Sequence, residues 1–207
     1  MAESATSQDL RLFDTPIRAI IPLDETFHVS RSLRRTIKKH PYRITFNTAF
    51  DKVISACAAP GEGRMTTWIN RPIIDLYTSL YRRGHAHAVE AWEGGELIGG
   101  LYGVSLGGAF FGESMFSHKH DASKIALVYL VALMRHCGFT LLDTQFQTEH
   151  LSQFGTHEIT RVNYHHMLAQ AVKKPVKLKR LAEAEWDYLA GAVAAGAASL
   201  QPVTQIS

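Results

Sequence analysis

The sequence predicts an α/β (α+β) sandwich built around a mostly antiparallel mixed sheet. Apolar periodicity gives the order strand, helix, helix, three-stranded meander, helix, strand, helix. Two glycine pairs, Gly94-Gly95 and Gly107-Gly108, separate the meander strands as hairpin turns do. The chain has 207 residues, of which 46% are apolar and 20% charged, so it can bury the core that such a fold requires.

The first half of the chain is predicted to contain one strand and two helices. The first 30 residues lack a strong period, and residues 42–46 suit a strand. Asn47 or Thr48 can cap the next helix, whose apolar residues follow a helical period up to Cys57. Residues 60–63 form a loop, and residues 70–83 form a second helix with Asn70 as its cap and Gly84 after its end.

The second half is predicted to hold the meander and three helices. Its strands span residues 88–92, 97–104 and 109–116. Asp121 or Ser123 caps an apolar helix that ends at Gly138, and a buried strand follows at 140–146. A helix at 160–172 and an alanine-rich helix up to Gly196 complete the order.

Composition excludes several classes of protein. The longest apolar run, residues 125–134, is much shorter than the roughly 20 residues that cross a bilayer. The first 20 residues lack the pattern of a secretory signal, and nothing suggests that the two cysteines pair, so we expect a cytoplasmic protein. A net charge of +3 is too small by itself to indicate nucleic-acid binding.

Seven ordered segments carry a resemblance to a known family. They are HVSRSL at 28–33, TWI at 67–69, GHAHAVE at 84–90, GGLYG at 99–103, FGESMFS at 111–117, DASK at 121–124 and LDTQ at 142–145. Over residues 18–168 the chain resembles leucyl/phenylalanyl-tRNA–protein transferases, and its element order is that of the GCN5-related acetyltransferase superfamily. Fold alone does not set function, so the ordered segments carry the assignment.

The resemblance implies an aminoacyltransferase of the bacterial N-degron pathway. Such an enzyme moves Leu or Phe, and less readily Met, from aminoacyl-tRNA onto proteins whose N-terminal residue is Arg or Lys, which marks them for proteolysis. It implies no metal and no nucleotide cofactor. We expect residues 31–175 to form an acyltransferase-like catalytic domain, followed by an alanine-rich tail at 176–207. Members usually carry a further N-terminal region, so residues 1–30 are interpreted as its remnant, in a short form or one whose start is assigned at an internal Met.

Two acids and a glutamine are the candidate catalytic residues. Glu113 lies in a glycine-flanked strand segment, and Asp143 ends an apolar strand. Since a buried acid without a partner is costly, either it awaits a cationic substrate or it pairs with a structural arginine or caps a turn. The resemblance favours the first alternative: Glu113 binds the basic side chain, while Asp143 and Gln145, on one strand face, orient and deprotonate the α-amine. Gln145 is a poor base, so Asp143 is the better proton acceptor.

The donor side chain requires an apolar pocket. The candidates are Leu101, Gly112, Leu127, Leu130, Met134 and Leu142. For any one of the apolar candidates, core packing is the simpler interpretation. By resemblance, Trp68 and Tyr77 stack with the 3′-terminal adenosine, although a Tyr on an apolar helix stripe is more often a core residue.

Basic and histidine clusters suggest two further sites. The basic residues Arg31, Arg34, Arg35, Lys38 and Lys39 lie within nine residues and are expected to contact acceptor-stem phosphates, unless they form an ordinary solvated face. The His85/His87 and His118/His120 pairs have a spacing found in metal sites. No third ligand is evident, so no metal is predicted.

Two other functions compete with the transferase. A small-molecule N-acetyltransferase would need a glycine-rich phosphate-binding turn before the central helix, and residues 117–123 contain no glycine. A shortened, inactive tRNA-binding relative is the other alternative. The presence of Glu113, Asp143 and Gln145 argues against it.

Overall fold

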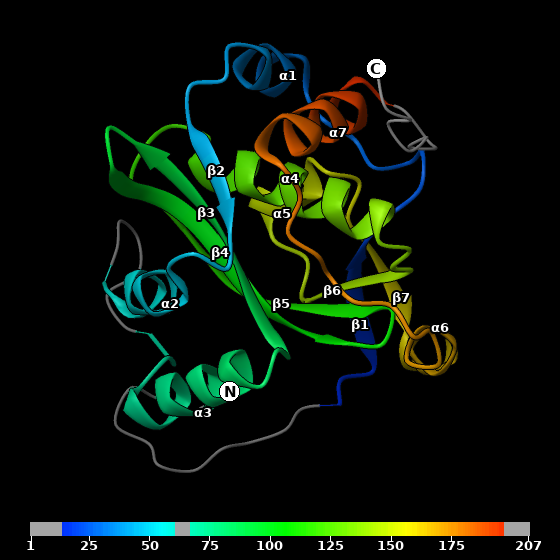
Figure 1. Cartoon of the computed structure of the whole chain (residues 1–207). Coiled ribbons are helices and arrows are strands. Elements are labelled where there is room, and N and C mark those ends of the chain that lie inside the picture. Colours follow the sequence, from blue (N-terminus) through cyan, green and yellow to red (C-terminus); the bar gives the residue numbers. More distant parts are fainter. Residues whose placement is uncertain (1–13, 61–66, 197–207) are drawn as a thin grey trace.

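A seven-stranded sheet runs through the computed structural model, which describes residues 14–60 and 67–196 (Figure 1). The strands are β1 (Ile17–Ile21), β2 (Arg43–Phe46), β3 (Ala86–Glu93), β4 (Glu96–Leu106), β5 (Ala109–Ser117), β6 (Leu141–Gln145) and β7 (His157–Thr160). Their order in the sheet is β2-β3-β4-β5-β6-β1-β7. Every neighbouring pair is antiparallel except β5 and β6, which confirms the predicted mostly antiparallel mixed sheet.

Helices cover both faces of the sheet (Figure 1). They are α1 (Arg31–Lys38), α2 (Phe50–Ala58), α3 (Arg71–Arg82), α4 (Ala122–His136), α5 (Glu149–Ser152), α6 (Arg161–Ala171) and α7 (Glu183–Ala195). Val89 and Leu101 pack into the same core as α4, whereas Ala88 and Tyr102 pack with α2 and α3. Because successive strand residues point to opposite faces, α4 and the α2–α3 pair cover opposite sides of the meander.

Most predicted elements are confirmed within a few residues. The five predicted strands correspond to β2 to β6, and both glycine pairs lie in their turns. The helix predicted at 70–83 is α3, where the Asn70 side chain accepts a hydrogen bond from the Ile73 amide at 3.1 Å. The helix predicted at 160–172 is α6. Residues 61–63 of the predicted loop, like residues 1–13 and 197–207, lie outside the described part of the chain.

Neither of two predicted side-chain caps forms. Helix α2 begins after Ala49, and its first amides are not capped by Asn47 or Thr48. Instead the buried Glu90 carboxylate, on β3, accepts hydrogen bonds from the Thr48 and Ala49 amides at 2.9 and 3.0 Å. A cap supplied by a neighbouring strand is a tertiary contact, so local sequence signals cannot predict it.

At the start of α4, likewise, the predicted side chains do not cap the helix. Asp121 occupies the cap position, but its side chain makes no capping hydrogen bond and pairs with Lys124 at 2.9 Å. Ser123 does not cap the helix either. Its amide donates to the Ser117 hydroxyl of β5, so the end of the strand holds the start of the helix.

The N-terminal strand and the C-terminal helix both join this structure. Strand β1, which the sequence analysis leaves within an unpatterned region, lies between β6 and β7. Helix α7 packs on α4, where Trp186 is buried and its indole N–H donates to the Tyr129 carbonyl at 2.9 Å. Among the described residues, none of the helices combines the length and the hydropathy needed to cross a membrane.

Candidate active site

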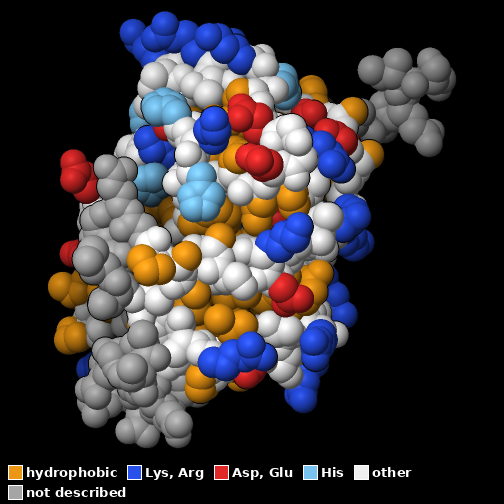
Figure 2. All heavy atoms as spheres, turned by 90° about the vertical axis from the view of Figure 1, so that its left-hand side faces the viewer, with side chains coloured by type: hydrophobic (Ala, Val, Ile, Leu, Met, Phe, Trp, Pro, Cys, Tyr) orange, Lys and Arg blue, Asp and Glu red, His pale blue; other side chains and the backbone are white. Residues whose placement is uncertain are grey.

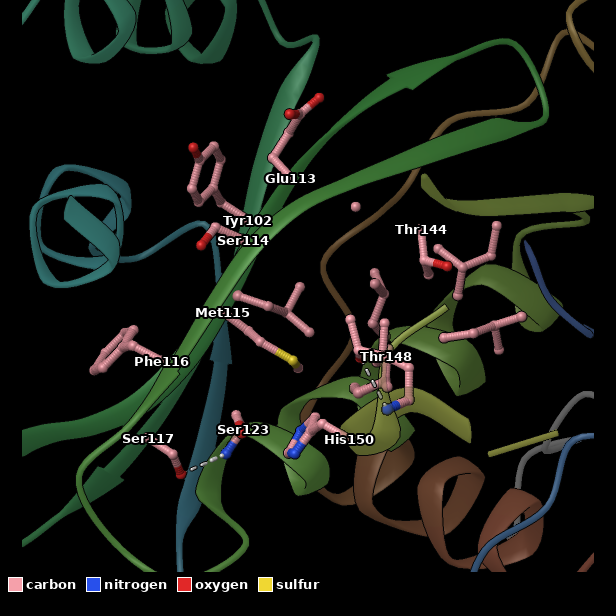
Figure 3. A pocket seen from close by; sticks show the side chains of 17 residues that line it. Tyr102, Glu113, Ser114, Met115, Phe116, Ser117, Ser123, Thr144, Thr148 and His150 are labelled. Carbon is pink, nitrogen blue, oxygen red and sulfur yellow. Dashed lines mark hydrogen bonds between the residues drawn. The ribbon is translucent and has the colours of Figure 1, made fainter. Parts of the chain in front are cut away.

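The candidate site lies where strands β5 and β6 separate. These parallel strands pair over Ala109–Phe111 of β5 and Leu141–Asp143 of β6. Beyond that point a cavity of about 780 Å³ opens between them, with α4 and α5 on its other side (Figure 3). Its volume is typical of a small-molecule site.

One wall of the cavity is the free edge of β5. Six consecutive residues, 112–117, line the cavity, although alternate side chains of a strand point to opposite faces. Figure 3 shows Met115 directed into the cavity, while Ser114 and Phe116 point the other way. The main chain of β5 therefore forms much of this wall.

The cavity is largely apolar and is lined by most of the predicted donor-pocket residues. The predicted residues that line the cavity are Leu101, Gly112, Leu127, Leu130 and Leu142. Met134 is fully buried in the core and does not line it. Because nearly all of α4 is buried, helical periodicity could not indicate which of its sides faces the cavity.

Glu113 is the extra residue of a β-bulge at one end of the cavity. Tyr102 on β4 is opposite Ser114, but the next residue, Gly103, is opposite Gly112. Glu113 therefore has no direct cross-strand partner. Bulges re-aim side chains and are frequent beside active sites.

Two side chains donate to the Glu113 carboxylate. The Gln145 amide nitrogen donates at 3.3 Å, and the Tyr77 hydroxyl also forms a hydrogen bond with it. Burial raises the pKa of Glu113, and these two hydrogen bonds partly offset that rise. The result is a poorly solvated carboxylate that a cationic group could reach from the cavity.

Gln145 adopts a strained backbone conformation at the end of β6. Its φ of 67° lies in the left-handed region, and the Phe146 amide donates to the Thr144 carbonyl at 2.8 Å. A hydrogen bond across three residues with positive φ at the centre is the rare form of γ-turn. Thr144 is itself skipped in the register with β1, so the simple alternation predicted for Asp143 and Gln145 is interrupted between them.

Asp143 is completely buried, and its carboxylate is surrounded by donors. Arg18 contacts both carboxylate oxygens, with a shortest distance of 2.8 Å, and the Tyr164 hydroxyl donates at 2.7 Å. The third donor is the backbone amide of Gln145, also at 2.7 Å. Of the alternatives for this acid, the structure shows the pairing with a structural arginine.

Trp68 and Tyr77 lie outside the cavity lining. Both are partly buried against the core formed by α2 and α3. The Tyr77 ring packs edge-on against Tyr102 with centroids 5.3 Å apart, and its hydroxyl reaches Glu113. Tyr77 is thus placed next to the site from the side opposite α4.

The predicted basic run forms helix α1. Leu33 and Ile37 are buried beneath it. The exposed basic residues are Arg31, Arg35, Lys38 and Lys39. Figure 2 shows the corresponding band of basic side chains at the top of the molecule. Arg34 is partly buried, and its side chain donates to the Val29 carbonyl at 2.9 Å, so it also fixes the helix start.

The histidines are distributed over separate environments. His87 is buried and lies between Asn47 and Ser105, each 3.0 Å from one ring nitrogen. His118 and His120 border a smaller surface pocket beside the start of α4, and His150 lines both this pocket and the main cavity. Within residues 14–60 and 67–196, no group of three or more His, Cys, Asp or Glu side chains is placed to hold a metal ion.

Sequence reasoning missed Arg18 and Tyr164. Both approach Asp143 from elements far away in the chain, β1 and α6. The available signal for Arg18 was a single charged residue inside the apolar run of residues 17–21. Such an arginine in a buried strand needs an acidic partner, and Asp143 is one of few acids that end an apolar strand.

Comparisons with known proteins agree with this architecture. A family described as leucyl/phenylalanyl-tRNA protein transferase matches residues 20–169. Proteins named leucyl/phenylalanyl-tRNA–protein transferase are 49% identical in Maricaulis maris (strain MCS10), 51% in Caulobacter vibrioides (strain NA1000 / CB15N) and 52% in Phenylobacterium zucineum (strain HLK1). Each alignment covers 100% of this chain and 91% of the relative.

Proposed function

Because this chain belongs to the leucyl/phenylalanyl-tRNA protein transferase family, we propose that it transfers Leu or Phe from aminoacyl-tRNA to N-terminal Arg or Lys. Met is accepted less readily. Transfer takes place in the bacterial cytoplasm and marks the acceptor for N-degron proteolysis. Strands β5 and β6 are parallel and separate after residues 111 and 143, which supports a GCN5-related acetyltransferase-like arrangement.

The observation that carries this proposal is the partly buried Glu113 carboxylate beside a largely apolar cavity. The donor side chain occupies the cavity between β5 and α4, where Leu127 and Leu130 give it an apolar surface. A pocket of this kind separates side chains that differ by one methylene by only about 1–3 kcal/mol, so several donors are accepted, whereas β-branched donors are excluded by shape. The Glu113 carboxylate binds the guanidinium or ammonium group of the acceptor.

The reaction is aminolysis of an activated ester. The acceptor amine attacks the ester carbonyl carbon, the peptide C–N bond forms, and the ester C–O bond to the ribose breaks. The amine loses one proton, and the released ribose oxygen gains one. Since the ester is already activated, holding the neutral amine in place can supply about 7–11 kcal/mol of the barrier lowering.

Gln145 orients the amine. Its amide nitrogen is directed to Glu113, which leaves the amide oxygen to accept a hydrogen bond from the α-amine. Glu113 and Gln145 thereby place the cationic side chain and the amine of one residue side by side. Asp143 is buried away from substrate and contributes through its contact with the Gln145 amide.

The 3′ end of the tRNA approaches from the side of α3, where Trp68 and Tyr77 lie. Base stacking on an aromatic ring contributes about 1–3 kcal/mol. The exposed basic residues of α1 contact acceptor-stem phosphates, which makes binding sequence-tolerant and sensitive to salt.

The test is a mass measurement. The purified chain is incubated with leucyl-tRNA and a peptide beginning with Arg, and a gain of one leucyl unit is expected. The same peptide with an acetylated N-terminus is the matched control, because it keeps the side chain but lacks the amine. Absence of transfer to the free peptide, with the fold intact and tRNA bound, would refute the proposal.

A further inference from the structure

The cluster around Asp143 joins three elements that are distant in sequence. Arg18 on β1, Tyr164 on α6 and the end of β6 meet at one carboxylate that is 0% exposed. A carboxylate has about four acceptor positions. Arg18, Tyr164 and the Gln145 amide occupy them, so substrate has no access to Asp143.

The same cluster determines the backbone at Gln145. A non-glycine residue in the left-handed region is strained, and surrounding contacts must offset that strain. The Asp143 oxygen that accepts the Gln145 amide at 2.7 Å provides such a contact, since hydrogen bonds to an ionised acceptor are about twice as strong as neutral ones. The turn therefore depends on the Asp143 carboxylate being fixed in direction.

Arg18 and Tyr164 fix that direction. The Arg18 guanidinium is held by Asp143 on one side and lies over the Tyr164 ring on the other, 5.1 Å from its centroid. Its contact with both oxygens fixes the plane of the carboxylate. The Tyr164 hydroxyl donates to Oδ2, which Arg18 also contacts, and leaves Oδ1 to accept the Gln145 backbone amide. Burial and the contact with Asp143 raise the pKa of Tyr164, so its hydroxyl remains a donor.

We propose that Arg18 and Tyr164 are positioning residues for aminoacyl transfer. Through Asp143 they hold the backbone of Gln145 in the turn that directs its side-chain amide toward Glu113. This inference rests on the proposed transferase function. It assigns strand β1 a direct part in the geometry of the active site. Without the cluster, the backbone at Gln145 relaxes, and its side-chain amide oxygen is no longer placed to accept a hydrogen bond from the acceptor amine.

The test uses two conservative variants and a matched control. Arg18→Lys keeps the charge but loses the two-oxygen contact, and Tyr164→Phe keeps the ring but loses the hydroxyl. Arg161→Ala is the control, because Arg161 also lies beside β1 but pairs with the exposed Asp14. Thermal unfolding establishes that each variant folds, and wild-type leucine transfer to an Arg peptide is measured first.

We expect kcat to fall about 100-fold in Arg18→Lys and about 10-fold in Tyr164→Phe, because misplacement by about 1 Å costs roughly 100-fold. The KM values for leucyl-tRNA and for the peptide should change less than twofold, and Arg161→Ala should match wild type. Deuterium exchange at the Gln145 amide should accelerate at least 10-fold in both variants. A purely structural role would not give this combination.

A double-mutant comparison isolates the path through Gln145. In a Gln145→Ala background, measured under single-turnover conditions at high enzyme concentration, Tyr164→Phe should have no further effect. Folded variants with wild-type kcat, unchanged Gln145 exchange, or an undiminished effect of Tyr164→Phe in the Gln145→Ala background would each overturn the positioning role. Absence of transfer by wild type would instead refute the proposed function.

Discussion

Replacing Glu113 with Gln should remove the preference for a cationic acceptor while preserving the shape of the site. Glutamine has nearly the same size and can still accept from the Tyr77 hydroxyl, so the bulge of β5 is retained. What is lost is the charge that would pair with Arg in a poorly solvated position. Hydrogen bonds to charged groups contribute about 1.5–3 kcal/mol, and a loss of about 2 kcal/mol corresponds to about 30-fold.

The assay compares two peptides that differ only in the first side chain. One begins with Arg and the other with citrulline, which is its neutral isostere. Wild type should transfer leucine to the Arg peptide with kcat/KM about 30-fold higher, whereas Glu113→Gln should treat both peptides alike. An unchanged ratio in the variant would show that the cation is recognised elsewhere and would refute the assignment of Glu113.

The ratio of kcat/KM for the Arg peptide to that for the citrulline peptide should also depend on pH. Because burial raises the pKa of Glu113, the carboxylate becomes protonated at a higher pH than an ordinary glutamate does. The preference for Arg over citrulline should therefore decline on acidification in wild type, with a midpoint above 4.5. It should stay flat in Glu113→Gln.

Further predictions concern stability and tRNA binding. Burial lowers the pKa of His87 from 6.5 to about 4, so only the unfolded chain gains this proton as pH falls through that range. Urea unfolding should show that the free energy of unfolding falls by about 2–3 kcal/mol more in wild type than in His87→Gln between pH 7.5 and 4.5. Equal decreases in the two proteins would contradict this. A Cβ at Gly99 would lie 2.5 Å from the Ala122 Cβ, so Gly99→Ala should cost about 1–3 kcal/mol in the same measurement, and an unchanged midpoint would show that α4 adjusts freely. Arg35→Ala with Lys38→Ala should weaken tRNA binding and reduce the slope of log affinity against log salt by about 1–2, and an unaltered slope would remove α1 from the interface.

The sequence was sufficient where the signal is local. Helix α3 has its cap at Asn70, a proline in its first turn and a glycine after its end, and each of these acts within a few residues. The meander is similar, since its strands alternate and its turns contain glycine pairs. Glu113 and Gln145, which lie within hydrogen-bond distance of each other, stay predicted site residues, and ordered family segments rather than chemistry pointed to them.

Long-range contacts account for what could not be predicted. Strand β7 is mostly exposed, so it has no apolar alternation to detect, and β1 is recognisable only from its two neighbours in the sheet. The partner of Asp143 lies 125 residues away at Arg18, and no pattern in a single sequence links them. The Glu113 bulge likewise depends on how β4 and β5 align.

In the proposed arrangement, the cavity wall formed by the edge of β5 limits how donor range can change. Main-chain atoms are the same whatever residue is encoded, so point mutations in residues 112–117 leave most of that wall as it is. Variation must come from the facing side chains of α4, such as Leu127 and Leu130, and from Met115, which points inward. Divergence or engineering of donor range is therefore concentrated in a few positions.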